Sequence, residues 1–308
     1  MPSEAPLTIS DLRNWLERGL PADGLRPGVA VIGDPVAHSR SPGMHQPALD
    51  ARDLGLRYVK IHVLPGEVAE VFSLLRKLGF TGTNVTVPHK LEALRACTEV
   101  DGAASLFQAV NTVHFRPDGV THGSNTDGPG LSAAVEEAFG KKLCTSSIAI
   151  AGAGGGAGRA AALQCALDGS PKIVLINRTV AKAESVAAEI RQVSPAMQAI
   201  VLAMDDFPAI KAALAGCDLL VNATSAGMKP EDPLPVPVES LHPGLAVYDM
   251  IYSPPETALL AAARNAGCPT ANGLSMLIHQ GAISFSRWFG GAPPVEIMRH
   301  ALMRPNGP

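Results

Sequence analysis

The stretch Ala151–Ala160, AGAGGGAGRA, holds five glycines in ten residues and decides the fold of the second half of the chain. An apolar run, SSIAIA (146–151), precedes it, and a run with helical spacing, AALQCAL (161–167), follows it. A glycine-rich turn between a strand and a helix exposes backbone N–H groups at the positive end of the helix dipole, where phosphates bind. The stretch therefore predicts a nucleotide-binding turn.

The glycines match the dinucleotide fingerprint G-x-G-x-x-G only in part. Counted from Gly152, the last glycine is replaced by Ala157, and the count Gly154-x-Gly156-x-Gly158 fits no better. The sequence leaves open which residues meet the phosphates, so the candidates are Gly152, Gly154, Gly155, Gly156 and Ala157.

The next apolar run ends in Asn177-Arg178-Thr179, with Lys182 one helical turn further on. In dinucleotide-binding folds this strand end meets the adenine ribose, and an acidic residue there binds a free 2′-hydroxyl. A cation suits a 2′-phosphate instead, so Arg178 and Lys182 favour NADP over NAD. The alternative interpretation is an exposed basic helix start that binds nothing.

Apolar, β-branched runs alternate with helical segments through this half of the chain. These runs are SIAIAG (147–152), KIVLIN (172–177), AIVLAM (199–204), CDLLVNA (217–223) and LAVYDMI (245–251). Continuous apolar strands separated by helices predict a parallel sheet that is covered on both faces and joined by right-handed crossovers.

The first half also alternates between strand and helix patterns, so the predicted fold class is α/β with two domains. Residues 1–27 are interpreted as an N-terminal extension made of a short helix and a linker. The first domain is placed at 28–128 and the second at 129–272. The last two helical patterns, within 273–308, are expected to return to the first domain.

Composition limits the classes of function. The chain has 308 residues, of which 46% are hydrophobic and 17% charged, which suits packed domains rather than disorder. A net charge of −3 without basic runs argues against a nucleic-acid or anionic-membrane partner. Five scattered cysteines, with no signal peptide and no membrane span, predict a reduced cytoplasmic protein. The histidines lack a ligand spacing, so no metal is expected. The expected partner is a small molecule rather than a nucleic acid or a membrane.

Four polar motifs stand at strand ends or turns of the first domain, where open α/β sheets bind ligands. They are HSRSP (38–42), NVTVPHK (84–90), AVNT (109–112) and NTDG (125–128). The hydroxyls of Ser39 and Ser41 could hold a carboxylate or a diol. For Ser41 alone, an equally good interpretation is an N-cap of the following helix.

Lys90 is the last residue of NVTVPHK, and Asp127 lies within NTDG. A lysine and an aspartate that converge on a polyol can act as a general acid/base and its orienting partner. Desolvation would lower the pKa of the lysine, and a neighbouring carboxylate would raise it. The alternative for Asp127 is simple capping of the helix that follows.

In this order, the motifs strongly resemble those of the shikimate dehydrogenase family over residues 28–289. The matching stretches are GDPVAHSRSPGMHQ, NVTVPHK, AVNT, SNTDG, NRT, LLVNATSAGM, YDMIY and GLSMLIHQGA. The resemblance implies a substrate domain followed by a Rossmann-type, doubly wound NADP-binding domain, with a cleft between them. The family's glycine turn usually reads G-x-G-G-x-x-R, and here Arg159 arrives one residue late.

The resemblance also implies roles for single residues. Lys90 is similar to the family's catalytic lysine, which exchanges a proton at the oxygen that becomes the ketone, and Asp127 resembles its partner. The implied substrate-binding residues are Ser39, Ser41, Thr86, Asn111, Asp127, Tyr252 and Gln280. The implied cofactor-binding residues are Gly152, Gly154, Gly155, Gly156, Ala157, Asn177, Arg178, Thr179, Lys182, Thr224, Met250 and Gly273.

The implied reaction is the reversible, NADP(H)-dependent reduction of 3-dehydroshikimate to shikimate, a step toward chorismate and the aromatic amino acids. One alternative is a quinate/shikimate dehydrogenase that uses NAD. A second is a Rossmann protein that senses a ligand without turnover. The chain is expected to act as a monomer or a homodimer.

Overall fold

The computed structural model describes residues 5–20, 26 and 28–303 of the chain. The predicted N-terminal helix is present as α1 (Ile9–Arg18). Most of the predicted linker and both ends of the chain lie outside the described residues, namely 1–4, 21–25, 27 and 304–308.

The chain forms two compact units. The first contains the chain up to Thr126 and again from Gln280 onward, and the second contains Asp127–His279. The chain therefore changes unit at 126/127 and 279/280, whereas the sequence places these boundaries at 128/129 and 272/273.

The first unit alternates strands and helices. Its elements are α1, β1 (Val29–Gly33), α2 (Ser41–Ala51), β2 (Tyr58–His62), α3 (Val68–Lys77), β3 (Gly82–Val85), α4 (Lys90–Ala96), β4 (Glu99–Val100), α5 (Gly102–Phe107), β5 (Thr112–Phe115), β6 (Thr121–Ser124) and α12 (Val295–Met303). Helix α11 (Leu274–Phe289) begins in the second unit and ends in the first.

The sheet of the first unit is mixed. Its strands are ordered β2-β1-β3-β5-β6-β4, with β1 parallel to both β2 and β3. Strand β5 is antiparallel to β3 and β6, and β5 and β6 form a hairpin around the turn Arg116–Gly119. The sequence did not predict β4 or α5. The signal for α5 was Asp101, whose carboxylate accepts the backbone N–H of Ala104 at 2.7 Å as an N-cap.

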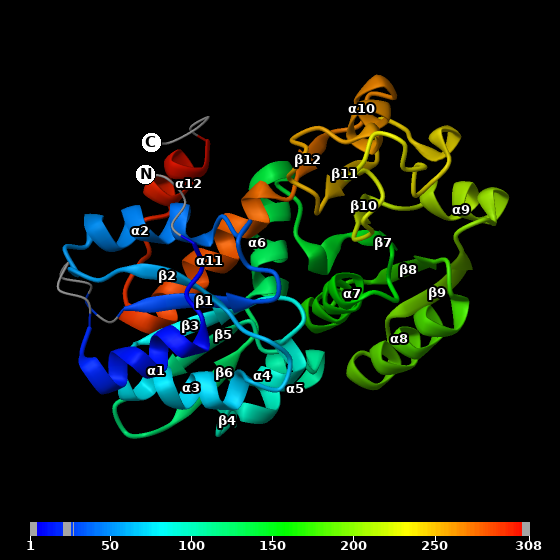
Figure 1. Cartoon of the computed structure of the whole chain (residues 1–308). Helices are drawn as coiled ribbons and strands as arrows, with labels where there is room; N and C mark the ends of the chain where they lie inside the picture. The colour runs from blue at the N-terminus through cyan, green and yellow to red at the C-terminus, as the bar shows by residue number, and fades with distance from the viewer. Residues whose placement is uncertain (1–4, 21–25, 27, 304–308) are drawn as a thin grey trace. The chain divides into compact units, whose positions relative to one another are not determined.

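Apolar side chains hold the helices onto this sheet. Leu12 of α1, Leu75 of α3 and Ala93 of α4 pack with Ala30 and Ile32 of β1 in one buried cluster. These three helices lie on the same side of the sheet (Figure 1). Helices α2 and α12 pack against each other, and α2 also contacts β1 and β2. The polar residues at the strand ends therefore lie at the edge of a sheet that these packed helices hold in place.

The second unit is a regular α/β layer structure. Its elements are α6 (Asp127–Phe139), the 3₁₀ turn Leu143–Thr145, β7 (Ser147–Ala151), α7 (Gly156–Asp168), β8 (Lys172–Asn177), α8 (Val180–Val193), β9 (Gln198–Ala203), α9 (Phe207–Leu214), β10 (Leu219–Asn222), the 3₁₀ turn Val238–Ser240, β11 (Ala246–Asp249), α10 (Ala258–Asn265), β12 (Thr270–Asn272) and the start of α11. The strand β12 was not predicted.

The strands of the second unit are ordered β12-β11-β10-β7-β8-β9, and every pair is parallel. In chain order this is the 3-2-1-4-5-6 arrangement of a Rossmann sheet, so the predicted fold class is confirmed. Helices α9 and α10 pack on one face through Ile210 and Leu260, which share a buried cluster with Val174 and Val247. Helices α7 and α8 pack against each other and lie on the opposite side of the sheet from α9 and α10 (Figure 1).

The glycine turn joins β7 to α7. Gly152 has a φ of +83°, and Gly155 is the N-cap of α7. A Cβ on Gly158 would lie 2.2 Å from the carbonyl oxygen of Gly152. A Cβ on Gly156 would meet no heavy atom within 4 Å. The glycine that lets the helix approach the strand is therefore Gly158, one residue later than the usual fingerprint.

This crowding predicts that Gly158→Ala destabilises the second unit, because the atoms it would meet are backbone atoms that cannot rotate away. We expect a loss of about 1–3 kcal/mol in the free energy of unfolding, the range for overpacking a tight site. Gly156→Ala is the matched control in the same helix turn and should unfold within about 0.5 kcal/mol of the parent. Equal urea midpoints for the two variants would contradict the assignment.

Candidate active site

The first unit brings several predicted residues to one edge of its sheet. Strand pairing aligns Asn84 with Thr112 and Thr112 with Ser124, so the end of β3, the start of β5 and the end of β6 share that edge. A Cβ on Gly33, at the end of β1, would lie 2.5 Å from the side chain of Thr86. The loop after β1 therefore also begins at this edge, as expected for ligand binding in open α/β sheets.

Ser39 and Ser41 lie where this loop enters α2. The backbone N–H of Ser41 donates to the hydroxyl of Ser39 at 3.3 Å. Ser41 is the first residue of α2 and Arg40 is its N-cap, so the interpretation of Ser41 as an N-cap is wrong. The guanidinium of Arg40 donates to the carbonyl of Leu302 at 2.6 Å, at the end of α12. Arg40 is thus engaged with the last helix while the two serines flank it.

Aromatic side chains pack next to Ser41. Tyr58 donates its hydroxyl to the side-chain oxygen of Asn84 at 2.7 Å. Burial raises the pKa of Tyr58 above its ordinary value, and the hydroxyl of Ser41 acts in the opposite direction. The ring of His45 stacks on Tyr58 at 4.7 Å, and burial lowers the pKa of His45 to about 3. The imidazole is therefore neutral and acts as a flat packing surface.

A buried hydrogen-bond network fixes the rest of this edge. Asn111 accepts the backbone N–H of Thr126 at 2.9 Å and donates to its hydroxyl at 3.0 Å. The hydroxyls of Thr112 and Thr126 both lie within hydrogen-bond distance of Ser284 on α11, at 2.8 and 3.3 Å. Thr126 also lies 3.5 Å from Gln280. Asn111 and Gln280 therefore both contact Thr126, and their predicted role in binding the substrate stays a prediction.

Lys90 is the first residue of α4. Its backbone carbonyl accepts the N–H of Val110 at 2.9 Å, and the ring of the preceding His89 makes a 2.7 Å hydrogen bond with the carbonyl of Val63. The start of α4 is therefore anchored from two directions. Asp127 begins α6, where a carboxylate is stabilised by the helix dipole. Because Lys90 belongs to the first unit and Asp127 to the second, their joint role stays a prediction.

In the second unit, Asn177 joins the glycine turn to the next strand. Its side-chain oxygen accepts the backbone N–H of Gly154 at 3.2 Å, and its amide donates to the carbonyl of Thr179 at 2.8 Å. A Cβ on Gly154 would lie 2.7 Å from the Cβ of Lys182. The structure thus brings the turn, Asn177 and Lys182 together.

The groups around this turn are open to solvent. Gly155, Gly156 and Ala157 are exposed, and so are Arg178, Thr179 and Lys182. Backbone N–H groups at a helix start and two exposed cations suit a phosphorylated ribose. Arg159 is engaged elsewhere, because its guanidinium forms an ion pair with Glu189 on α8.

The remaining predicted cofactor residues follow β10 and β11. A Cβ on Gly152 would lie 2.8 Å from the side chain of Thr224, so the ends of β7 and β10 meet at the point where the strand order reverses. A Cβ on Gly273 would lie 2.0 Å from the carbonyl oxygen of Met250, which leaves no space for any side chain. Tyr252 is half-buried two residues after Met250. Its predicted contact with the substrate carboxylate remains a prediction.

Sequence reasoning missed the buried polar side chains that hold these segments. Asn84 and Ser284 support the first unit, and Asn222, Asp249 and Thr257 are linked to one another in the second. A signal was present, because Asp249 is a charged residue at the end of an otherwise apolar run, LAVYDMI (245–251).

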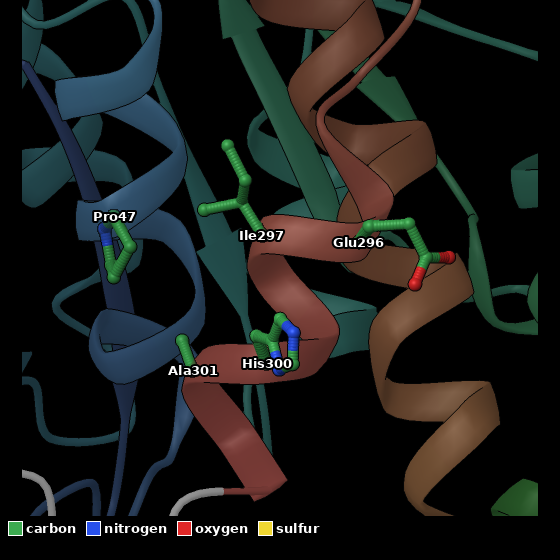
Figure 2. Close-up of a pocket in the computed structure, with 5 residues that line it drawn as sticks. All are labelled: Pro47, Glu296, Ile297, His300 and Ala301. Carbon is green, nitrogen blue, oxygen red and sulfur yellow. The ribbon is translucent and has the colours of Figure 1, made fainter.

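A hollow elsewhere in the first unit contains none of the predicted residues. It lies between α2 and α12 and is lined by Pro47, Glu296, Ile297, His300 and Ala301 (Figure 2). Within the described part of the chain, no group of three or more His, Cys, Asp or Glu side chains is arranged to hold a metal ion. The helices described here include none with the length and apolarity to cross a membrane.

Comparison with known proteins identifies the family. Residues 31–113 match the model of the shikimate dehydrogenase substrate binding domain, and residues 273–303 match that of the shikimate 5′-dehydrogenase C-terminal domain. The chain is 42% identical over 281 residues to the shikimate dehydrogenase (NADP(+)) of Methanopyrus kandleri. The aligned residues cover 89% of this chain and 94% of that protein.

Solved structures agree with the sequence match. A crystal structure of a shikimate dehydrogenase in complex with NADP+ superposes with a TM-score of 0.80 and 38% identity, covering 90% of this chain and 95% of that one. The shikimate 5-dehydrogenase of Listeria monocytogenes, in complex with shikimate and NAD, gives a TM-score of 0.82 at 35% identity, covering 90% and 96%. At these identities and coverages, this chain belongs to the shikimate dehydrogenase family.

Proposed function

We propose that this chain catalyses the reversible, NADP(H)-dependent reduction of 3-dehydroshikimate to shikimate. The observation that carries the proposal is the sheet edge of the first unit, where Ser39, Ser41, Thr86 and Asn111 lie in a chain whose relatives are shikimate dehydrogenases. Hydroxyl and amide groups match a substrate that carries a carboxylate and several ring hydroxyls. Such a set of groups is expected to bind the ring in one orientation.

In this proposal the two serine hydroxyls and Tyr252 bind the carboxylate, and Thr86, Asn111 and Gln280 bind ring oxygens. Lys90, as an ammonium, donates a proton to the oxygen that becomes the hydroxyl, and accepts it in the reverse direction. Asp127 binds the same region of the ring and orients the lysine. Bound NADP(H) supplies or accepts the hydride. Proton transfer by a positioned group typically contributes roughly 10²–10⁴ in rate.

The same proposal assigns the cofactor's ends to different parts of the second unit. The turn Gly152–Ala157 offers backbone N–H groups to the pyrophosphate, next to Thr224. Arg178, Thr179 and Lys182 bind the 2′-phosphate, and Asn177 keeps the turn beside them. Met250 and Gly273 flank the nicotinamide.

The proposal extends to the setting of the enzyme. The reaction belongs to the route to chorismate and the aromatic amino acids, in the cytoplasm, with the protein as a monomer or a homodimer. All five cysteines are free thiols, in keeping with a reducing compartment.

The direct test is a set of initial rates with shikimate and with quinate, each with NADP and with NAD. Shikimate with NADP should be the fastest pair. Faster turnover of quinate with NAD would identify the chain as a quinate/shikimate dehydrogenase instead. Binding without turnover of any pair would identify a ligand sensor.

Lys90→Ala should lower kcat by about 10²–10⁴, because the proton donor is removed from the transition state. The KM for shikimate should change little, since carboxylate and ring contacts remain. Lys77→Ala on α3 is the matched control, because Lys77 is exposed and outside the site. Steady-state kinetics of both variants check this expectation, and near-normal turnover by Lys90→Ala would remove Lys90 from the mechanism.

Arg178→Ala should raise the KM for NADP by about tenfold or more, because a charge-assisted contact to the 2′-phosphate is lost. The KM for NAD should stay within about twofold, since NAD lacks that phosphate. Arg191→Ala, at the other end of α8, removes an exposed arginine of the same unit without touching the site. If Arg178→Ala weakens both cofactors equally, Arg178 does not select NADP.

A further inference from the structure

Asp249 is a buried carboxylate at the end of β11 whose three hydrogen bonds reach separate segments of the second unit. Its side chain is 0% exposed. One oxygen accepts the side-chain amide of Asn222 at 3.0 Å and the backbone N–H of Ile251 at 3.0 Å. The other oxygen accepts the hydroxyl of Thr257 at 2.6 Å. All three partners are uncharged donors, so they support the ionised form of the carboxylate.

The contact with Asn222 leads to the loop after β10. The side-chain oxygen of Asn222 accepts both the backbone N–H of Thr224, at 3.0 Å, and its hydroxyl, at 2.7 Å. The Thr224 hydroxyl oxygen in turn accepts the N–H of Ala226 at 3.0 Å. The amide of Asn222 donates to Asp249 at 3.0 Å and to the carbonyl of Ala226 at 3.3 Å, and these two acceptors together fix which way the oxygen of Asn222 points. Asp249 is the nearer of the two, so it contributes to the conformation of Thr224, which lies against Gly152.

The contact with Ile251 leads to the loop after β11. Ile251 lies between Met250 and Tyr252, and its carbonyl accepts the N–H of Gly273 at 3.2 Å. One carboxylate oxygen therefore holds both loops, one carrying Thr224 and the other carrying Met250 and Tyr252.

The contact with Thr257 stabilises the buried charge. Thr257 is the N-cap of α10, and its hydroxyl oxygen accepts the N–H of Leu260 at 3.3 Å while its proton goes to Asp249. The carboxylate thus lies beyond the positive end of a helix. Burial holds the pKa of Asp249 above its ordinary value, and the hydrogen bonds from Thr257, Ile251 and Asn222 offset only part of that rise.

We infer that Asp249 is a positioning residue for the cofactor: it holds the Thr224 loop and the Met250–Tyr252 loop in the geometry that binds NADP(H). This inference rests on the proposed function, which places Thr224 and Met250 in the cofactor site. Asp249 acts through Asn222 and through the Ile251 backbone. Of the residues in these two loops, Thr224 and Met250 are assigned to the cofactor and Tyr252 to the substrate carboxylate, which the two serines of the first unit also bind. Removal of Asp249 should therefore weaken the cofactor more than it weakens shikimate.

The test uses the full-length enzyme and measures the Kd of NADPH by calorimetry, together with the KM of shikimate at saturating NADP. Asp249→Ala leaves the N–H of Ile251 without its acceptor, and leaves the amide of Asn222 with the carbonyl of Ala226 alone, at 3.3 Å. We expect the Kd of NADPH to rise about tenfold or more. The KM of shikimate should stay within about threefold.

The conservative variant separates positioning from charge. In Asp249→Asn, the side-chain oxygen can still accept from Asn222 and Ile251, and the new amide can donate to the Thr257 oxygen. We expect this variant to restore NADPH binding to within about threefold of the parent. Ser170→Ala is the matched control, because Ser170 is also buried and hydrogen-bonded but lies before β8, away from both loops. It should lower the melting temperature without changing the Kd of NADPH.

Each outcome decides the inference. A folded Asp249→Ala that binds NADPH as the parent does would overturn it, and so would equal losses for NADPH and shikimate. If Asp249→Ala yields no folded protein, Asn222→Ser tests the first contact, and unchanged NADPH affinity there would also overturn the inference. Failure of the parent enzyme to bind NADPH would instead remove the proposed function.

Discussion

The approach of Gly158 to the carbonyl of Gly152 is the contact on which the geometry of the second unit depends. Because no side chain fits there, α7 starts directly against the end of β7 and directs its first N–H groups over the turn. In the same turn, a Cβ on Gly154 would lie 2.6 Å from the side chain of Asn177 and 2.7 Å from that of Lys182. A phosphate at this turn would be held mainly by backbone, so selectivity is left to side chains at the end of β8.

In the first unit, neutral hydrogen bonds fix the strand ends, as the close backbone contact fixes the glycine turn of the second unit. Asn84, Asn111, Thr112, Thr126 and Ser284 come from different elements, and each buried group has a partner in the same network. Buried polar groups cost little when all are paired, but a partly satisfied network would be expensive. The edge that carries Thr86 and Asn111 therefore has one favoured arrangement, which suits recognition of a ring with several fixed hydroxyls.

The sequence predicted most elements and the strand ends at which the candidate site residues lie, because strand periodicity, helix-ending glycines and motif spacing are local properties. It could not predict β4 or β12, which are two and three residues long and carry no periodicity. It also missed Gly158, since the crowding at that position depends on how α7 packs on the turn. Ser284 was missed for the same reason: its partners Thr112 and Thr126 are 172 and 158 residues away in the sequence, and only the folded chain brings them together. For Asp249, the partner Asn222 is 27 residues away, although Ile251 and Thr257 are near in sequence.

The second unit carries exposed cations near the glycine turn and a buried carboxylate at the end of β11. The two kinds of charged residue differ in how easily they can be replaced, which bears on the choice between NADP and NAD. Arg178 and Lys182 are exposed, so replacing them disturbs no core packing, and their attraction to a phosphate is screened by salt. Asp249 is buried and shares its oxygens among three donors, so its replacement leaves the N–H of Ile251 unpaired and removes one acceptor each from Asn222 and Thr257. If Arg178 and Lys182 bind the 2′-phosphate as proposed, selectivity between NADP and NAD can shift through single surface residues. If Asp249 positions the two loops as inferred, the capacity to bind either dinucleotide depends on contacts that must be kept together.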